Sequence, residues 1–141
     1  MSGTVLSAKH LQPEIQVFGC EPAKADDAYR SLQTGTLQSQ ESSDTIADGL
    51  RASLAERTFA ILRKQLSGIF LVTEEEIISA MALIWERMKV ITEPSSAVAL
   101  APLLRPETLE DISLAGPRMR RHRIGIVLSG GNVDLRALPF R

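Results

Sequence analysis

The fold of this 141-residue chain is decided by the stretch Gly125-Ile126-Val127-Leu128-Ser129-Gly130-Gly131-Asn132-Val133. An apolar run leads directly into a hydroxyl, two glycines and an amide. Continuous aliphatic runs are typical of buried parallel strands, and ligands bind just beyond the carboxyl ends of such strands. We therefore predict that Ser129 faces a ligand, that the glycines let the backbone approach it, and that Asn132 offers an amide. Taken alone, the pattern also fits an ordinary turn after a strand.

Outward from this stretch, helical and strand patterns alternate along the chain. Strands are predicted at residues 15–20, 68–72 and 123–128, and helices at residues 4–11, 26–32, 54–66 and 95–104. A further helix follows Thr73, which forms a capping box with Glu76; its apolar stripe is typical of a buried face. Strands joined by helical crossovers predict an α/β fold, a three-layer parallel sheet with helices on both faces.

Composition and charge restrict the function classes. The chain has 16 basic and 17 acidic side chains, so no overall field draws it to nucleic acid. We expect no membrane segment and no secretory signal, and the cytoplasm is the expected compartment. The single cysteine, Cys20, is interpreted as a buried structural thiol. The basic cluster at residues 118–123 is interpreted as a solvated loop, and His122 has no acidic partner nearby in the sequence.

Five ordered blocks make the chain similar to a known enzyme family. They are Ser2-Gly3-Thr4, residues 19–27 with Gly-Cys-Glu-Pro and Ala-Asp-Asp, Thr45 to Gly49, Glu93 to Ala97, and Val127 to Asp134. Over about 130 residues these blocks resemble the C-terminal part of serine racemases and serine/threonine dehydratases, which are pyridoxal-phosphate enzymes of the tryptophan synthase β type. The resemblance implies pyridoxal 5'-phosphate as the cofactor.

The resemblance also implies roles for particular residues. Ser129 would pair with the pyridine nitrogen, and a neutral hydroxyl would not force that nitrogen to be protonated. Gly49 would lie with its backbone beside the cofactor ring, and Glu93 would lie near the ring edge. Gly130 and Asn132 complete the expected cofactor-binding set. From sequence alone, Glu93 is equally explained as an acid at a helix start before a proline.

A second constellation consists of hard oxygen ligands. Glu21 and Asp27 supply carboxylates and Ala25 a backbone carbonyl, a set that suits Mg²⁺ or Ca²⁺. Family members similar to this chain hold a divalent cation there. By spacing alone, the favoured alternative is that Asp26 and Asp27 cap the helix that follows them.

The resemblance further implies that part of the enzyme lies outside this sequence. In the family, the lysine that binds the cofactor and the glycine-rich phosphate loop lie upstream of the block Ser2-Gly3-Thr4. None of the lysines here has the context of that residue, including Lys9 in Ser7-Ala8-Lys9. We therefore interpret residues 1–141 as a single partial catalytic domain, the C-terminal portion of the large domain of a fold-type II pyridoxal-phosphate enzyme, inactive by itself.

The implied activity is racemisation of serine, or loss of ammonia from L-serine or L-threonine after removal of the Cα proton. The full-length enzyme would act on a small amino-acid substrate and form a homodimer. A competing hypothesis is a non-catalytic fragment or a regulatory remnant that binds a partner protein. A weaker one is a cation-binding module built on Glu21 and Asp27.

Overall fold

The computed structural model describes residues 1–108 and 123–140. Its sheet contains two parallel strands, β1 (Phe18–Pro22) and β2 (Gly68–Val72), with Phe18 paired to Gly68 and Pro22 to Val72. The predicted strand at residues 68–72 is confirmed, whereas the one predicted at residues 15–20 begins and ends later. The α/β class with a parallel sheet is therefore confirmed.

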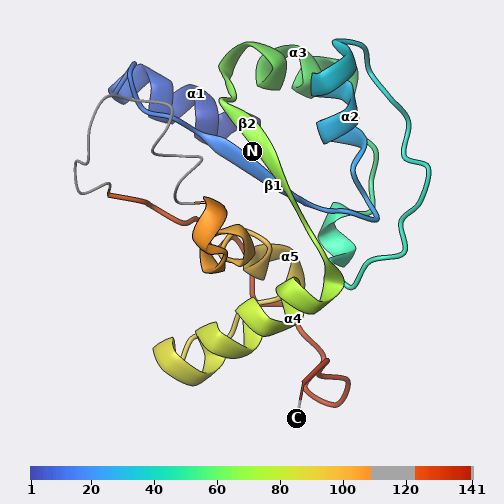
Figure 1. Ribbon diagram of the computed structural model, residues 1–141, viewed down its shortest axis with the longest axis vertical. Coiled ribbons are helices and arrows are strands. Elements are labelled where there is room, and N and C mark those ends of the chain that lie inside the picture. Colours follow the sequence, from blue (N-terminus) through green and yellow to red (C-terminus); the bar gives the residue numbers. More distant parts are fainter. Residues whose placement is uncertain (109–122, 141) are drawn as a thin grey trace.

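Helices lie on both sides of the two strands in the view of Figure 1. One group, above the strands, comprises α1 (Ser2–Leu11), α2 (Asp27–Thr34) and α3 (Glu56–Gln65). The other group, below them, contains α4 (Glu74–Leu83) and α5 (Pro94–Ala97). Short helical turns lie between these elements and after them: η1 (Asp48–Leu50), the π-helical turn η2 (Ile84–Met88) and η3 (Ala101–Leu104). No helix in the described ranges is long and apolar enough to cross a membrane.

Local sequence signals explain where several of these elements begin and end. Thr73 Oγ1 accepts a bond from the Glu76 N–H, and the Glu76 carboxylate accepts one from the Thr73 N–H, so the predicted capping box starts α4. The single helix predicted at residues 95–104 is wrong, because the chain forms α5 and η3 with a turn between them. Pro102 explains the break, since proline lacks the N–H that would continue an α-helix.

The main core lies between β2, α4 and α5. It confirms most of the burial predicted for the stripe that begins in α4, since Ile77 and Met81 are fully buried, but Met88 at the end of that stripe is 59% exposed. Trp85 packs edge-on against Phe140, with ring centroids 5.6 Å apart, so the end of the described chain is also attached to this core. The core consists of Ala47, Val72, Ile77, Ala80, Met81, Ile84, Ala97, Val98 and Ala101.

The strand predicted at residues 123–128 is wrong in this structure. No strand is formed there, and Ile124 and Val127 are 45% and 60% exposed. A strand needs a neighbour for its backbone N–H and C=O groups, and the described part of the chain provides only β1 and β2. The following residues are nevertheless placed by specific contacts, because Leu128 packs against the core.

Candidate functional site

The predicted ligand-facing loop meets the start of α5. The carbonyl oxygen of Gly130 accepts two hydrogen bonds, from the Glu93 N–H at 3.1 Å and from the Thr92 hydroxyl at 3.3 Å. In return, the Asn132 N–H donates to Glu93 Oε2 at 2.9 Å. Two segments almost forty residues apart in sequence are therefore joined by reciprocal bonds.

A pair of hydroxyl groups lies at the centre of this junction. Ser96 is buried, and its Oγ lies 3.1 Å from Ser129 Oγ. The same Ser96 oxygen accepts a hydrogen bond from the Gly130 N–H at 2.7 Å. Ser129 itself is exposed.

Gly49 reaches the same region from a different part of the chain. Its N–H donates to Ser95 Oγ at 2.9 Å, and the Ser95 hydroxyl donates to Asp48 Oδ1 at 3.3 Å. A Cβ at Gly49 would lie 3.0 Å from Ser95 Oγ, so any side chain there would require Ser95 to move. The structure thus groups, around the start of α5, all the residues predicted to bind the cofactor: Gly49, Glu93, Ser129, Gly130 and Asn132.

Sequence reasoning missed the serines that hold this group together. Ser95 binds Gly49, and Ser96 binds Ser129 and Gly130. The signal available in the sequence was two consecutive hydroxyls directly after Pro94, a residue typical of the first turn of a helix. Glu93 is the residue before α5, and its carboxylate makes no capping bond within that helix. It points to the loop instead, because it accepts from Asn132.

The two glycines of the loop lie against different kinds of atoms. A Cβ at Gly130 would lie 2.6 Å from Glu93 Oε1, whereas a Cβ at Gly131 would lie 2.6 Å from the backbone carbonyl oxygen of Ile91. Neither contact is possible for a real side chain without movement. Close packing of the loop on the segment before α5 therefore requires glycine at Gly131, where the neighbour is backbone, whereas at Gly130 the end of the Glu93 side chain would have to move.

The proposed cation ligands lie between the end of β1 and the start of α2. Ala25 and Asp27 are buried, and Glu21 is partly buried. Glu21 Oε2 accepts from the Tyr29 N–H at 2.8 Å, and Asp27 Oδ2 accepts from the Leu54 N–H at 2.6 Å. Each carboxylate therefore already binds the backbone through one oxygen.

Burial raises the pKa of Glu21 to about 7, and the nearby charge of Asp27 contributes in the same direction. The Tyr29 N–H opposes this rise. A positive ion would relieve the cost of a buried carboxylate beside a second one. Within the described ranges, no group of three or more His, Cys, Asp or Glu side chains could hold a metal, so a cation here would need carbonyl and water ligands as well.

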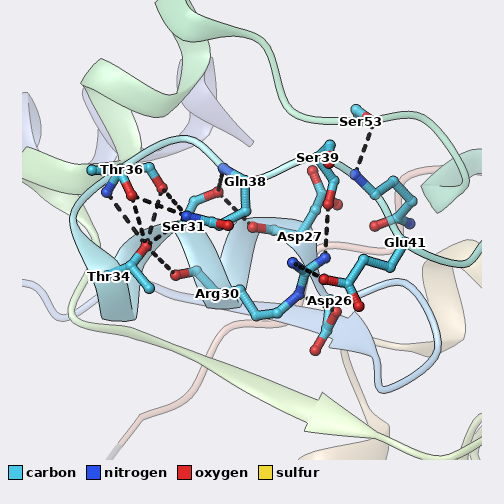
Figure 2. Close-up of polar contacts among 11 residues, drawn as sticks. Asp26, Asp27, Arg30, Ser31, Thr34, Thr36, Gln38, Ser39, Glu41 and Ser53 are labelled. Atoms are coloured by element: carbon cyan, nitrogen blue, oxygen red, sulfur yellow. Dashed lines mark hydrogen bonds and ion pairs between the residues drawn. The ribbon is translucent and has the colours of Figure 1, made fainter.

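Figure 2 shows how α2 is tied to the polar loop that follows it. Asp26 does not cap α2 through its side chain; its Oδ1 accepts from Arg30 Nε at 2.8 Å. Arg30 also donates to Glu41 at 3.0 Å and to the carbonyl oxygen of Ser39 at 2.8 Å. Asp26 therefore occupies the N-cap position of α2, but its side chain makes no capping bond, because the Arg30 guanidinium binds its carboxylate.

The remaining candidate groups lie in ordinary surroundings. Burial, and then the neighbouring Glu21 charge, raise the pKa of the Cys20 thiol to about 12, which suits a structural thiol rather than a nucleophile. Lys24 pairs with Asp44 at 3.1 Å on the surface. Of the basic cluster at residues 118–123, only Arg123 is among the described residues, and His122 is not.

A serine–glycine loop, glycine backbone and a carboxylate thus meet at one junction of a parallel α/β fold. Residues 1–130 match the family model described as pyridoxal-phosphate dependent enzyme, so the chain belongs to that family. The expected family is therefore confirmed.

Individual relatives agree with this assignment. The chain is 46% identical over 140 residues to a serine racemase of Dictyostelium discoideum and 40% identical over 141 residues to a β-hydroxyaspartate dehydratase of Paracoccus denitrificans. These two matches span 98% and 99% of this chain, but only 41% and 42% of the relatives' own lengths. The structure of maize serine racemase superposes with a TM-score of 0.87 at 38% identity, covering 96% of this chain and 41% of that one. The fold is that of the fold-type II enzymes, as expected.

Proposed function

We propose that this chain forms the part of a serine racemase or serine/threonine ammonia-lyase that holds the pyridine ring of pyridoxal phosphate. The observation that carries the proposal is the meeting of Gly49, Glu93 and the loop at residues 129–132 around the start of α5. An exposed hydroxyl beside glycine backbone suits a flat ring with one acceptor nitrogen.

When bound, pyridoxal phosphate supplies an electron sink that stabilises negative charge at the Cα atom of an amino acid. In the proposed arrangement, Ser129 binds the ring nitrogen through a neutral hydroxyl, which leaves that nitrogen free of the proton that a carboxylate partner would favour. Gly49 offers its backbone to the ring. Glu93 lies near the ring edge and also holds the loop by accepting from the Asn132 N–H.

The finer parts of the proposal concern the whole protein. The substrate is serine or threonine, and reprotonation at Cα gives racemisation whereas loss of the β-hydroxyl gives a 2-oxo acid and ammonia. The cofactor-binding lysine comes from polypeptide outside these 141 residues, so the 141-residue chain is inactive by itself. A cytoplasmic homodimer that holds Mg²⁺ or Ca²⁺ at Glu21, Ala25 and Asp27 completes the proposal.

The test is to supply the full-length protein with pyridoxal phosphate and L-serine, and to measure D-serine, 2-oxo acid and ammonia. Turnover is expected, and Ser129→Ala should lower it while the cofactor stays bound. Ser67→Ala is the matched control. It changes an exposed serine directly before β2 and should behave as wild type. Turnover by the 141-residue chain alone, or none by the full-length protein, would contradict the proposal.

A second candidate function is non-catalytic binding of a partner protein. The exposed apolar side chains of Ile124 and Val127 favour it, because such groups commonly mark contact surfaces. Binding of a partner by a full-length protein that takes up no cofactor would support this candidate over the enzyme.

A further inference from the structure

Ser96 is a buried hydroxyl with two partners in the candidate site. It lies in α5, is 1% exposed, and neighbours Ser129 Oγ at 3.1 Å and the Gly130 N–H at 2.7 Å. The Gly130 bond uses Ser96 Oγ as an acceptor. The hydroxyl hydrogen of Ser96 therefore still needs an acceptor of its own.

The cost of burial decides which serine donates in the pair. A buried donor left without a partner costs about 1–3 kcal/mol, whereas an exposed hydroxyl can turn to water. Ser96 is buried and Ser129 is exposed, so the lower-energy arrangement has the Ser96 O–H donating to Ser129 Oγ. The hydrogen of Ser129 is then free to point away from Ser96 and toward a ligand.

We propose that Ser96 is a positioning residue whose hydroxyl donates to Ser129 Oγ and thereby directs the Ser129 O–H at the lone pair of an unprotonated ring nitrogen. The inference rests on the proposed function and adds to it the residue that orients the Ser129 hydroxyl. A donor facing the nitrogen stabilises its neutral form, so the pKa of the bound nitrogen should be lower with Ser96 than without it.

The experiment uses the full-length protein loaded with pyridoxal 5'-phosphate that carries ¹⁵N in its ring. The pH at which the ¹⁵N chemical shift changes gives the pKa of the ring nitrogen. Ser96→Ala should raise it by about 0.7 unit, which corresponds to about 1 kcal/mol at 1.36 kcal/mol per unit, the net value of one hydrogen bond. In the cofactor-free protein, the same change should speed hydrogen exchange of the Gly130 amide about fivefold.

Ser31 provides a matched control, because it is also a buried serine with two partners. Its hydroxyl donates to the Asp27 carbonyl oxygen at 2.6 Å and accepts from the Gln38 N–H at 2.9 Å (Figure 2). Ser31→Ala should lower stability but leave the ring nitrogen's pKa unchanged. Ser96→Thr keeps a hydroxyl and should retain the wild-type pKa.

Each outcome decides the inference. If Ser96→Ala does not fold, Ser96→Cys keeps the volume with a weak donor and should give the same upward shift. An unchanged pKa in a folded Ser96 variant, or an equal shift in Ser31→Ala, would overturn the inference while the proposed function stands. A full-length protein that binds no pyridoxal phosphate would overturn both together.

Discussion

The Asn132 N–H donates to the Glu93 carboxylate at 2.9 Å across 39 residues of sequence. Glu93 returns a bond through its own N–H to the Gly130 carbonyl oxygen. The loop at residues 129–132 is thus held by one residue at two points. This reciprocity makes the loop a preformed part of the site, independent of any bound ligand.

Glu93→Ala should release the loop. A bond to a charged acceptor contributes about 1.5–3 kcal/mol, and its loss leaves the Asn132 N–H without that partner. We expect a stability loss of about 1.5 kcal/mol in chemical denaturation and faster hydrogen exchange at Asn132. Glu93→Gln retains an acceptor oxygen and should lose less. Equal losses in both variants would show that the carboxylate does not hold the loop.

Alanine substitutions should rank the glycines of the loop. Gly131→Ala is opposed by the rigid backbone oxygen of Ile91 and should cost about 2 kcal/mol. Gly130→Ala meets only the end of the Glu93 side chain, which can move, and should cost about 1 kcal/mol. Gly125→Ala has open space and is the control, within about 0.5 kcal/mol of wild type. Thermal unfolding gives the ranking, and a reversed order would contradict the packing described.

The ion pair between Glu76 and Arg105 should make stability depend on pH. The hydrogen bond from Arg105 holds the pKa of Glu76 below its ordinary value. A lowered folded-state pKa stabilises the protein above the unfolded value near 4.5, and that contribution is lost as pH falls through the lower folded value.

Glu76→Gln should therefore be less stable than wild type by about 1 kcal/mol at pH 7, and the difference should close below pH 4.5. Denaturation midpoints between pH 7 and pH 3 measure it. Glu86→Gln removes a more exposed partner of Arg87 and should show almost no difference at any pH. A stability difference between Glu76→Gln and wild type that widens toward low pH would contradict the stabilising role given to the Glu76–Arg105 ion pair.

Divalent cations should stabilise the full-length protein if the ligands of β1 and α2 converge on an ion. At a hundredfold excess of Mg²⁺ or Ca²⁺ over its dissociation constant, the gain is about 2.7 kcal/mol. Glu21→Gln should remove most of this gain, whereas Glu41→Gln, at the exposed partner of Arg30, should keep it. Calorimetry with and without chelator measures both. A melting temperature that neither Mg²⁺ nor Ca²⁺ changes would rule out the site.

The 141-residue chain by itself should associate in solution. Ile126 and Val127 are exposed in an extended segment without a strand neighbour in the described structure, and such apolar segments favour pairing between copies. Val127→Lys should shift sedimentation toward the monomer. Leu11→Lys, at a site 81% exposed on α1, should not. A wild-type chain that sediments as a sharp monomer would contradict this expectation.

Local patterns were sufficient for much of the fold. The capping box at Thr73 fixed the start of α4, and the apolar stripe through Ile77 and Met81 identified its buried face. These signals act within one or two helical turns, so the sequence contains both partners close together. The family and its cofactor-binding candidates were likewise recognisable, because the Ser129 and Glu93 blocks are short and contiguous.

Only the tertiary structure decided how those blocks interact. Glu93 turns to Asn132, and Ser96 reaches Ser129, through bonds that span more than thirty residues. Asp26 was assigned to a helix cap, but Arg30 competes for it with a charged donor. The run from Ile124 to Leu128 has the pattern of a strand, yet forms none here. By itself the sequence determined which segments are apolar, capped or polar. The partner that each polar group binds depends on the surfaces that folding brings together. Whether an apolar run forms a strand depends on whether a neighbouring strand is there to pair with it.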